Sequence, residues 1–439
     1  MNSDELHSTN QETDNASPLF PPPDFTLQKM LSILPEYNKE DNIKKPVVNI
    51  KIKTHNVDTF TFVLSRVLPS YANAIRRTIL SDIPVVGFLT TPYEENKATI
   101  IKNTSKFNNE YLKQRLSCIP IHNIDAKLSN EELLGKYVEL KVKNNTDSML
   151  WVTTQDFELF DKNTREKVPG GEKIIETLFP PFVSPIDDTK HYIDLLILRP
   201  FISESLPKEE INLTCEFSIC TAKQNSCYNV SQQISYENTS DVVKIANKIK
   251  ELKIENQSKN QTDLNFMIKN FELLEAKRLF IPNSFNFIVK SIGIYNSKTL
   301  VQHACGIIAD NLNILMDAIM TSNESIITIR PNLETTIPNC WDIILHNEDY
   351  TLGTMLNDQL FRNFCQMEKN KDEGQEKSIN NMLDFCGFKK EHPHDTFSVI
   401  RVGFADKTHS HIEFIQFMFS KIIPTIRDEF EHMQKLLEN

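Results

Sequence analysis

The fold of this chain is decided by Pro69-Ser-Tyr-Ala-Asn-Ala-Ile-Arg-Arg-Thr-Ile-Leu-Ser-Asp-Ile-Pro84, because a weaker copy of its pattern returns at Asp349-Tyr-Thr-Leu-Gly-Thr-Met-Leu-Asn-Asp-Gln-Leu-Phe361. A shift of 281 positions (345 − 64) aligns the two segments and pairs side chains of similar chemistry. The aligned pairs are Leu64 with Leu345, Ser70 with Thr351, Ala72 with Gly353, Ile75 with Leu356, and Ile79 with Leu360. The sequence therefore predicts two versions of one structural module.

The residues around the first copy predict a pair of strands followed by a helix. Val47 to Lys53 and Thr59 to Val67 alternate apolar and polar residues on either side of His55-Asn56, which is typical of paired strands. Pro69 suits the first turn of a helix, and Pro84 ends that helix. The apolar stripe between the two prolines consists of Ala72, Ile75, Ile79 and Leu80.

The second copy repeats this order of strand, polar corner and helix. Cys340 to Leu345 is a short apolar run that predicts a strand. Asp349 or Thr351 can cap the helix that follows, since the side-chain oxygens of both residue types accept hydrogen bonds from a first helical turn.

Each copy also acquires a late strand, at Phe285 to Val289 and at Phe397 to Val402, and then a long amphipathic helix. Leaving the apolar stripe of such a helix in water costs roughly 1.5–3 kcal/mol per large side chain, so each stripe needs a partner surface. The other copy is the obvious partner. The stripes are Val301, Ala304, Ile308, Leu312, Leu315 and Ile319 in the first helix, and Ile412, Ile415, Phe419, Ile422, Ile426, Phe430, Met433 and Leu437 in the second.

Three motifs follow one another along residues 46–439. They are Asn73-Ala-Ile-Arg-Arg-Thr-Ile-Leu-Ser-Asp-Ile-Pro84; Asn103-Thr-Ser105 with Glu110-Tyr-Leu-Lys-Gln-Arg-Leu-Ser-Cys-Ile-Pro120; and Glu348-Asp-Tyr-Thr-Leu-Gly353 with Cys386-Gly-Phe-Lys-Lys-Glu-His-Pro393. In this order they resemble the alpha-type assembly subunits of multisubunit DNA-dependent RNA polymerases. The first two motifs are similar to a helix and the start of the insert domain in the larger alpha-like subunit, and the third is similar to the smaller alpha-like subunit.

The resemblance implies an α+β fold in which two alpha-type dimerisation modules of one chain form an intramolecular pseudo-twofold dimer. In most such polymerases the two modules are separate chains, whereas the fusion here resembles the polymerases of large cytoplasmic DNA viruses. The expected domains are a flexible extension at 1–45, a first module at 46–90 and 280–325, a mainly β insert domain at 91–279, and a second module at 326–439.

The resemblance also implies a function. The chain is expected to be a non-catalytic scaffold that binds the largest and second-largest polymerase subunits, together with small polymerase subunits, and to use no cofactor. If the source is a virus, transcription would take place in the host cytoplasm and the chain would also be packaged in the virion. For any other source, transcription would take place in the nucleus. A DNA-binding transcription regulator without a polymerase is the alternative.

Arg76 and Arg77 are the leading candidates for partner contact. Adjacent helical side chains point about 100° apart, so at least one guanidinium stays on the surface, where its planar fork suits a carboxylate or a carbonyl. The predicted partner-binding residues are Asn73, Arg76, Arg77, Arg115, Asp349, Thr351, Leu352 and Gly353. The predicted dimer-interface residues are Val301, Ile308, Leu312, Leu315, Ile319, Ile415, Phe419, Ile422 and Ile426.

Composition argues against several other functions. Lys and Arg total 48 against 59 Asp and Glu, so the formal net charge is −11. A negative body opposes binding to duplex DNA, which requires a positive surface. None of the 10 glycines lies in a phosphate-cradling loop, and no motif pairs a nucleophile with a base. Specific DNA binding, nucleotide binding and catalysis are therefore not expected.

The eight cysteines and a histidine pair were weighed as metal ligands. Short-spaced cysteine pairs, which clamp a tetrahedral ion, do not occur. Reduced thiols are the expected state, and a metal at Cys215, Cys220 and Cys227 is the less favoured alternative. His392-Pro393-His394 is interpreted as a turn.

The remaining segments carry smaller expectations. No signal peptide or membrane span is expected from the polar start and the short apolar runs. The insert should begin with strands and end in two helices of unknown role. Pro424 should kink the last helix near Ile423. Further ranges are a helical stripe at Leu27 to Leu34, insert strands at 137–142, 150–152, 192–198 and 211–219, insert helices at 241–255 and 263–276, a tether at 321–338 and a solvated loop at 367–377.

Overall fold

The computed structural model describes residues 46–50, 59–122, 130–201, 207–257, 260–332, 335–365, 383–404 and 411–438. The predicted extension at 1–45, the His55-Asn56 corner and the charged segment at 367–377 lie outside these residues. Two compact units divide the described chain. One contains Ser240–Ile281, and the other contains the described residues up to Thr239 and from Pro282 onward.

The first sheet is built from β1 (Val47–Ile50), β2 (Thr59–Ser65), β13 (Phe280–Ser291) and β12 (Ser231–Ser240), in the order β1-β2-β13-β12. β2 runs antiparallel to both β1 and β13. α2 (Pro69–Ser81) follows β2, with Pro69 in its first turn, and α8 (Ser297–Thr321) follows β13. The elements predicted around the first copy are confirmed.

The second sheet repeats this order of strands. It consists of β14 (Ile327–Pro331), β15 (Cys340–His346), β17 (Phe397–Phe404) and β16 (Leu383–Lys389), in the order β14-β15-β17-β16. α9 (Tyr350–Leu360) follows β15, and a π-helical turn, η5 (Phe361–Cys365), continues it. α10 (His411–Glu438) follows β17. The two sheets therefore correspond strand by strand: β1 corresponds to β14, β2 to β15, β13 to β17 and β12 to β16.

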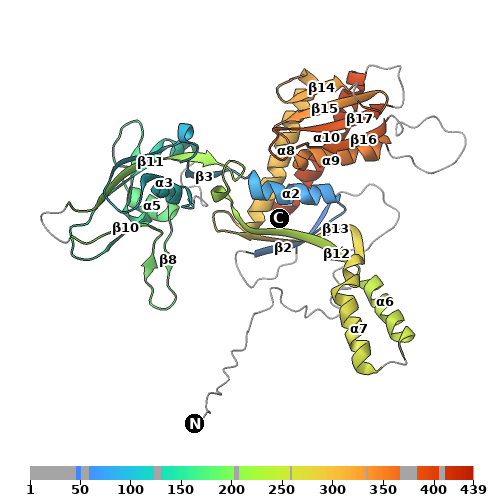
Figure 1. Cartoon of the computed structure of the whole chain (residues 1–439), viewed down its shortest axis with the longest axis horizontal. Coiled ribbons are helices and arrows are strands. Elements are labelled where there is room, and N and C mark those ends of the chain that lie inside the picture. Colours follow the sequence, from blue (N-terminus) through green and yellow to red (C-terminus); the bar gives the residue numbers. More distant parts are fainter. Residues whose placement is uncertain are drawn as a thin grey trace, which may run out of the picture. The chain divides into compact units, whose positions relative to one another are not determined.

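The long helices α8 and α10 lie against each other in opposite directions (Figure 1). Near one end of the pair, Gln302 Nε2 of α8 donates to the carbonyl oxygen of Leu437, at 2.8 Å. Near the other end, Gln416 Nε2 of α10 donates to the carbonyl oxygen of Ile319, at 3.2 Å. Each helix therefore donates a side-chain hydrogen bond to a carbonyl in the last turn of its neighbour, where intrahelical donors run out.

A single apolar core joins the two sheets to their helices. It includes Leu64 and Leu345 from the central strands, Ile75 and Leu356 from α2 and α9, and the inner faces of α8 and α10. By length and composition α8 could cross a membrane, but 44% of its apolar window is buried inside the protein. Its hydrophobicity is thus accounted for by this core.

The structure differs from expectation in the region between the modules. The predicted tether at 321–338 contains β14, which pairs with β15 from Ile327 opposite Leu345 to Pro331 opposite Trp341. The β-branched residues of Ile327-Thr-Ile favour a strand, which explains why this segment pairs with β15. The link from α8 to β14 is therefore shorter than predicted. β16 was not predicted either.

α10 runs unbroken through Pro424. A proline within a helix is tolerated where the helix bends, so the kink near Ile423 stays a prediction. His392-Pro393-His394 does form a turn, in which Asp395 N donates to the carbonyl oxygen of His392 at 3.1 Å.

The first part of the insert is mainly strand. Its main sheet has the order β3-β11-β5-β7, with β4 also paired to β11, and a second apolar core lies beneath it. The four predicted insert strands are confirmed by β5 (Lys136–Lys143), β6 (Leu150–Thr153), β10 (Asp194–Leu198) and β11 (Glu210–Cys220). The strands that were not predicted are β3 (Val85–Phe88), β4 (Ala98–Asn103), β7 (Phe157–Asp161), β8 (Phe182–Val183) and β9 (Lys190–His191), and the helices of this part are α3 (Asn109–Ser117), α4 (Asn130–Leu134) and α5 (Gly171–Leu178).

The unit Ser240–Ile281 is helical, as expected for the end of the insert. It contains α6 (Val242–Glu255) and α7 (Gln261–Leu273). Asp241 caps α6 by accepting a hydrogen bond from Lys244 N at 3.0 Å. The described residues also contain short 3-10 turns: η1 (Tyr93–Glu95), η2 (Thr154–Asp156), η3 (Ser226–Tyr228) and η4 (Glu275–Arg278).

Candidate functional site

α2 and α9, the helices of the two repeated motifs, lie side by side in opposite directions. Arg77, late in α2, forms an ion pair with Asp349 and donates from Nε to Thr351 Oγ1 at 2.9 Å. Gln359, late in α9, donates from Nε2 to the Tyr71 hydroxyl at 2.9 Å. The beginning of each helix is therefore held by the end of the other.

Asp349 is the N-cap residue of α9, so the alternative between Asp349 and Thr351 is resolved. Its Oδ1 accepts a hydrogen bond from Thr351 N at 2.8 Å. Burial opposes ionisation of this carboxyl, but the hydrogen bonds from Thr351 and the charge of Arg77 outweigh burial and hold its pKa below the usual value. Asp349 therefore stays charged and serves both the helix and the arginine.

A second acid lies beside Asp349. Burial raises the pKa of Glu348 to about 7, with Lys223 opposing the shift and the carboxylates of Asp349 and Asp82 adding to it. Lys223 comes from the turn after β11, where its backbone N donates to the carbonyl oxygen of Ser81 at 2.8 Å. Its Nζ donates to the carbonyl oxygen of Asn347 at 3.4 Å. One insert turn thus contacts both the end of α2 and the corner before α9.

Arg76 is fixed differently from Arg77. Its Nε and Nη2 donate to Oδ1 of Asn73, one turn earlier in α2, at 3.2 and 2.9 Å. Both side chains are half-buried, and no acid of the described chain forms an ion pair with Arg76. Of the two adjacent arginines, Arg76 is therefore the one whose charge the described chain leaves unneutralised.

Three of the predicted partner-binding residues point inward. Thr351 and Leu352 are only 8% and 2% exposed. A Cβ on Gly353 would overlap the ring of Phe388 on β16, so the glycine permits this strand to approach α9. Leu352 and Gly353 therefore serve packing within the chain, which the sequence motif alone did not indicate.

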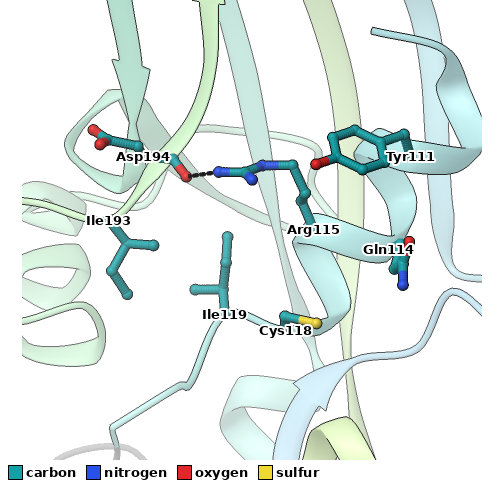
Figure 2. Close-up of a pocket in the computed structure, with 7 residues that line it drawn as sticks. All are labelled: Tyr111, Gln114, Arg115, Cys118, Ile119, Ile193 and Asp194. Atoms are coloured by element: carbon teal, nitrogen blue, oxygen red, sulfur yellow. Dashed lines mark hydrogen bonds between the residues drawn. The ribbon is translucent and has the colours of Figure 1, made fainter.

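Arg115 lies on α3, far from the α2–α9 contact in sequence. Its Nε and Nη2 donate to the carbonyl oxygens of Leu195 and Asp194, both at 2.7 Å, and its guanidinium lies 6.0 Å from the Tyr111 ring. Arg115 is one of the residues that line a pocket of about 320 Å³, and Figure 2 shows its side chain together with the others. The pocket is lined by Tyr111, Gln114, Arg115, Cys118, Ile119, Ile193 and Asp194.

The predicted interface residues all lie in the core shared by α8 and α10. None of these side chains is more than 2% exposed: Val301, Ile308, Leu312, Leu315, Ile319, Ile415, Phe419, Ile422 and Ile426.

Sequence reasoning missed Tyr71, which is 1% exposed and stacks on Phe430 of α10 with ring centroids 5.2 Å apart. Burial raises its pKa above the usual value, and the charge of Glu429 adds to the shift. Its spacing of four from Ile75 on the apolar stripe was the available signal.

The cysteines weighed as metal ligands are buried or half-buried. Burial raises the pKa of Cys215 above its usual value and that of Cys220 to about 11, so both side chains are protonated thiols at neutral pH. Within the described ranges, no group of three or more His, Cys, Asp or Glu side chains is arranged to hold a metal ion.

Parts of this chain are similar in sequence to known proteins. The model of the RNA polymerase Rpb3/Rpb11 dimerisation domain matches residues 61–312. A subunit named for RNA polymerases I and III, rpac1 of Dictyostelium discoideum, is 29% identical over 154 residues, covering 30% of this chain and 43% of the relative. The polymerase subunit Rpo3 of Pyrococcus horikoshii is 33% identical over 75 residues, covering 17% of this chain and 26% of the relative.

The chain thus spans less than half the length of either relative. The family match, by contrast, extends over more than half of the 439 residues, from β2 through the insert to α8. This chain belongs to the RNA polymerase Rpb3/Rpb11 dimerisation domain family.

Proposed function

We propose that this chain is a non-catalytic assembly scaffold of a DNA-directed RNA polymerase, in which two alpha-like modules of one chain form an intramolecular pseudo-twofold dimer. The observation that carries the proposal is the repeated order of strands in the two sheets, each followed by a long helix of one common core. The family that residues 61–312 match is described as a dimerisation domain. The second sheet and α10 occupy the role of the dimer partner.

Reciprocal contacts support the twofold relation. Gln302 and Gln416 each donate to a late carbonyl of the opposite long helix. Arg77 and Gln359 each reach the beginning of the opposite short helix. Each pair joins the end of one helix to the equivalent region of the other, as an approximate twofold axis requires, although Arg77 aligns with Asp358 rather than with Gln359.

Fusion has a thermodynamic consequence for such a dimer. The link from the end of α8 to the start of β14 covers only residues 322–326. A short tether raises the effective concentration of one module near the other to about the millimolar range, so pairing becomes independent of expression level. The same arrangement resembles the fused subunits of large cytoplasmic DNA viruses. A viral source would place the chain in the host cytoplasm and in the virion, and any other source would place it in the nucleus.

The two faces of the pseudo-dimer are assigned to two unlike partners. The face of α2 with Asn73 and Arg76 binds the second-largest subunit, because an arginine held in place by its own helix is ready to bind a carboxylate or carbonyl. The surface of the second module, around α9, binds the largest subunit. The pocket beside Arg115 provides a further contact, and small subunits complete the assembly.

The decisive experiment is an affinity purification of the tagged chain from its native source, analysed by mass spectrometry. Two subunits larger than about 100 kDa with polymerase sequences should accompany it in equal amounts. Recovery of the chain without them would refute the scaffold.

A site-directed version tests the α2 face. Arg76→Glu should leave the unfolding midpoint unchanged and lose the second-largest subunit, since the side chain bonds only to Asn73 among the described residues. Arg330→Glu, at an exposed arginine of β14, is the matched control for charge. Equal recovery of the second-largest subunit with both variants would remove Arg76 from the docking face.

The pseudo-dimer has its own test. Residues 1–323 and 324–439, co-expressed as two chains, should associate, because this division leaves β14 with its sheet. Separate elution of two folded fragments at micromolar concentration would contradict the shared core.

A further inference from the structure

A short hairpin of the insert exposes an unusual concentration of apolar side chains. β8 pairs with β9, with Phe182 opposite His191 and Val183 opposite Lys190. Phe182, Val183 and Ile186 are 66%, 48% and 94% exposed, and Figure 1 shows β8 projecting from the other insert strands. Single exposed apolar residues are ordinary, but three within five positions form a local patch that suits binding.

Polar contacts fix the shape of this hairpin without burying the patch. Ser184 N donates to the carbonyl oxygen of Thr189 at 2.9 Å, and Asp188 N donates to that of Ser184 at 3.0 Å. The Thr189 hydroxyl donates to Asp187 at 2.9 Å. At the base, Lys190 Nζ lies 2.6 Å from a carboxylate oxygen of Glu176 on α5. A preformed hairpin loses less conformational entropy when it binds, so its apolar residues contribute more to affinity.

The charges at the tip select the kind of partner. Asp187 and Asp188 follow Ile186 directly and are exposed. Hydrogen bonds from Ser184 and Thr189 hold the pKa of Asp187 below its usual value, so its carboxylate remains charged. Neither acid has an ion-pair partner in the described chain, whereas Lys190 is balanced by Glu176. A negative tip is repelled by nucleic acid and by anionic lipid and is complemented by a basic protein surface.

We propose that residues 182–191 form a docking arm that inserts Ile186 and Phe182 into an apolar pocket of a neighbouring polymerase subunit. Lysine or arginine side chains at the rim of that pocket face Asp187 and Asp188. The identity of the neighbour as a polymerase subunit rests on the proposed function, whereas the arm itself rests on the exposure, the order and the charge of the hairpin.

Photo-crosslinking in the intact polymerase tests the arm. Benzoylphenylalanine replaces Ile186 in the tagged full-length chain, and in a matched control it replaces Ile101, which is 61% exposed on β4 of the same insert. The expected product from position 186 is a crosslink to one site of another subunit, where apolar residues have lysine or arginine neighbours. The control should not reach that site. Crosslinks confined to this chain or to nucleic acid, or none at all, would overturn the arm.

Substitutions give a second measurement. Phe182→Ser with Ile186→Ser should weaken binding of the crosslinked subunit on the order of tenfold or more, as expected for anchor residues of an interface. Asp187→Lys with Asp188→Lys should weaken it in the same direction, and Ile101→Ser should leave it unchanged. The unfolding midpoint should not move, because the replaced side chains are exposed. Unaltered binding with both double variants would also reject the arm.

The two proposals fail in distinguishable ways. If the wild-type chain does not purify with the two large subunits, the scaffold function is refuted. If the wild-type chain does purify with them, but the hairpin variants bind as tightly as wild type, only the arm is refuted.

Discussion

The corners that lead into α2 and α9 occupy equivalent positions before a helix, but one carries apolar side chains and the other carries charged side chains. Under the shift of 281 positions (348 − 67), Val67-Leu68 aligns with Glu348-Asp349. Val67 is 4% exposed and belongs to the apolar core, whereas Glu348 and Asp349 face Lys223 and Arg77. α2 begins with Pro69 and has no side-chain cap, while Asp349 caps α9. The same helix start is thus stabilised by burial in one copy and by charge in the other.

This difference makes the contact between the copies asymmetric. Only the corner of α9 offers carboxylates, so only it can receive an arginine, and the reciprocal contact at the start of α2 is the neutral hydrogen bond from Gln359 to Tyr71. An identical pair of copies would carry like charges at both corners. The two copies therefore differ in charge at this corner, which permits an ion pair on one side of the contact only.

The aligned pair Ala72 and Gly353 gives the largest expected effect. Gly353→Ala should destabilise the protein by about 1–3 kcal/mol, because the new Cβ would overlap the Phe388 ring. This cost exceeds the gain in helix propensity of about 1 kcal/mol that alanine brings to a helix interior. Chemical denaturation with guanidinium chloride measures the difference.

The control for Gly353→Ala is a background in which its effect on stability should change sign. In a Phe388→Leu background, which removes the ring, Gly353→Ala should become neutral or stabilising by up to about 1 kcal/mol. Ala72→Gly should cost about 1 kcal/mol through helix propensity, and about 0.8 kcal/mol more through loss of a methyl group that is fully buried. An equal loss from Gly353→Ala in both backgrounds would mean that Phe388 is not the reason for the glycine.

The aligned pair Val67 and Glu348 predicts a pH dependence. The pKa of Glu348 in the folded protein, about 7, lies above its ordinary value of 4.5, so the folded state binds the proton more tightly than the unfolded state. Stability contributed by this proton is complete below the ordinary pKa and is lost as the pH rises toward 7 and above. Glu348→Gln should therefore be more stable than wild type at pH 8, by on the order of 1 kcal/mol, and closer to wild type at pH 5.

Unfolding curves of the two proteins at pH 5, 6, 7 and 8 measure this difference. Glu413→Gln, at an exposed glutamate of α10, controls for the loss of one negative charge. A stability gain from Glu348→Gln that is the same at every pH would exclude titration of Glu348 as its cause.

Much of the fold was predictable because its signals are local. The alternation in β2, the stripe of α8 and the proline at the start of α2 each lie within one element, and each element formed as predicted. β14 and β16 were harder, because short strands at the edges of a sheet depend on their neighbour for pairing. The matching strand order became visible only when these two edge strands were included.

The candidate site was less predictable because its contacts join distant residues. Asn73 and Arg76 lie one turn apart, and their pairing follows from helical spacing. The pairing of Arg77 with Asp349 spans the two copies, and nothing in either motif specifies it. For the same reason, Leu352 and Gly353 had no sequence signal that separated packing from partner contact.

The aligned pair Leu68 and Asp349 gives the smallest expected effect. Arg77 and Asp349 are each 30% exposed, so water screens their attraction and their coupling should be about 0.5 kcal/mol. A double-mutant cycle with Arg77→Ala and Asp349→Asn measures it, because asparagine keeps the cap of α9 while removing the charge. The matched cycle with Arg76→Ala and Asp349→Asn should give no coupling, since Arg76 bonds to Asn73. Equal coupling in both cycles would mean that Asp349 attracts any nearby arginine through its charge and that the ion pair with Arg77 is not specific. The asymmetry between the copies would then depend on net charge alone.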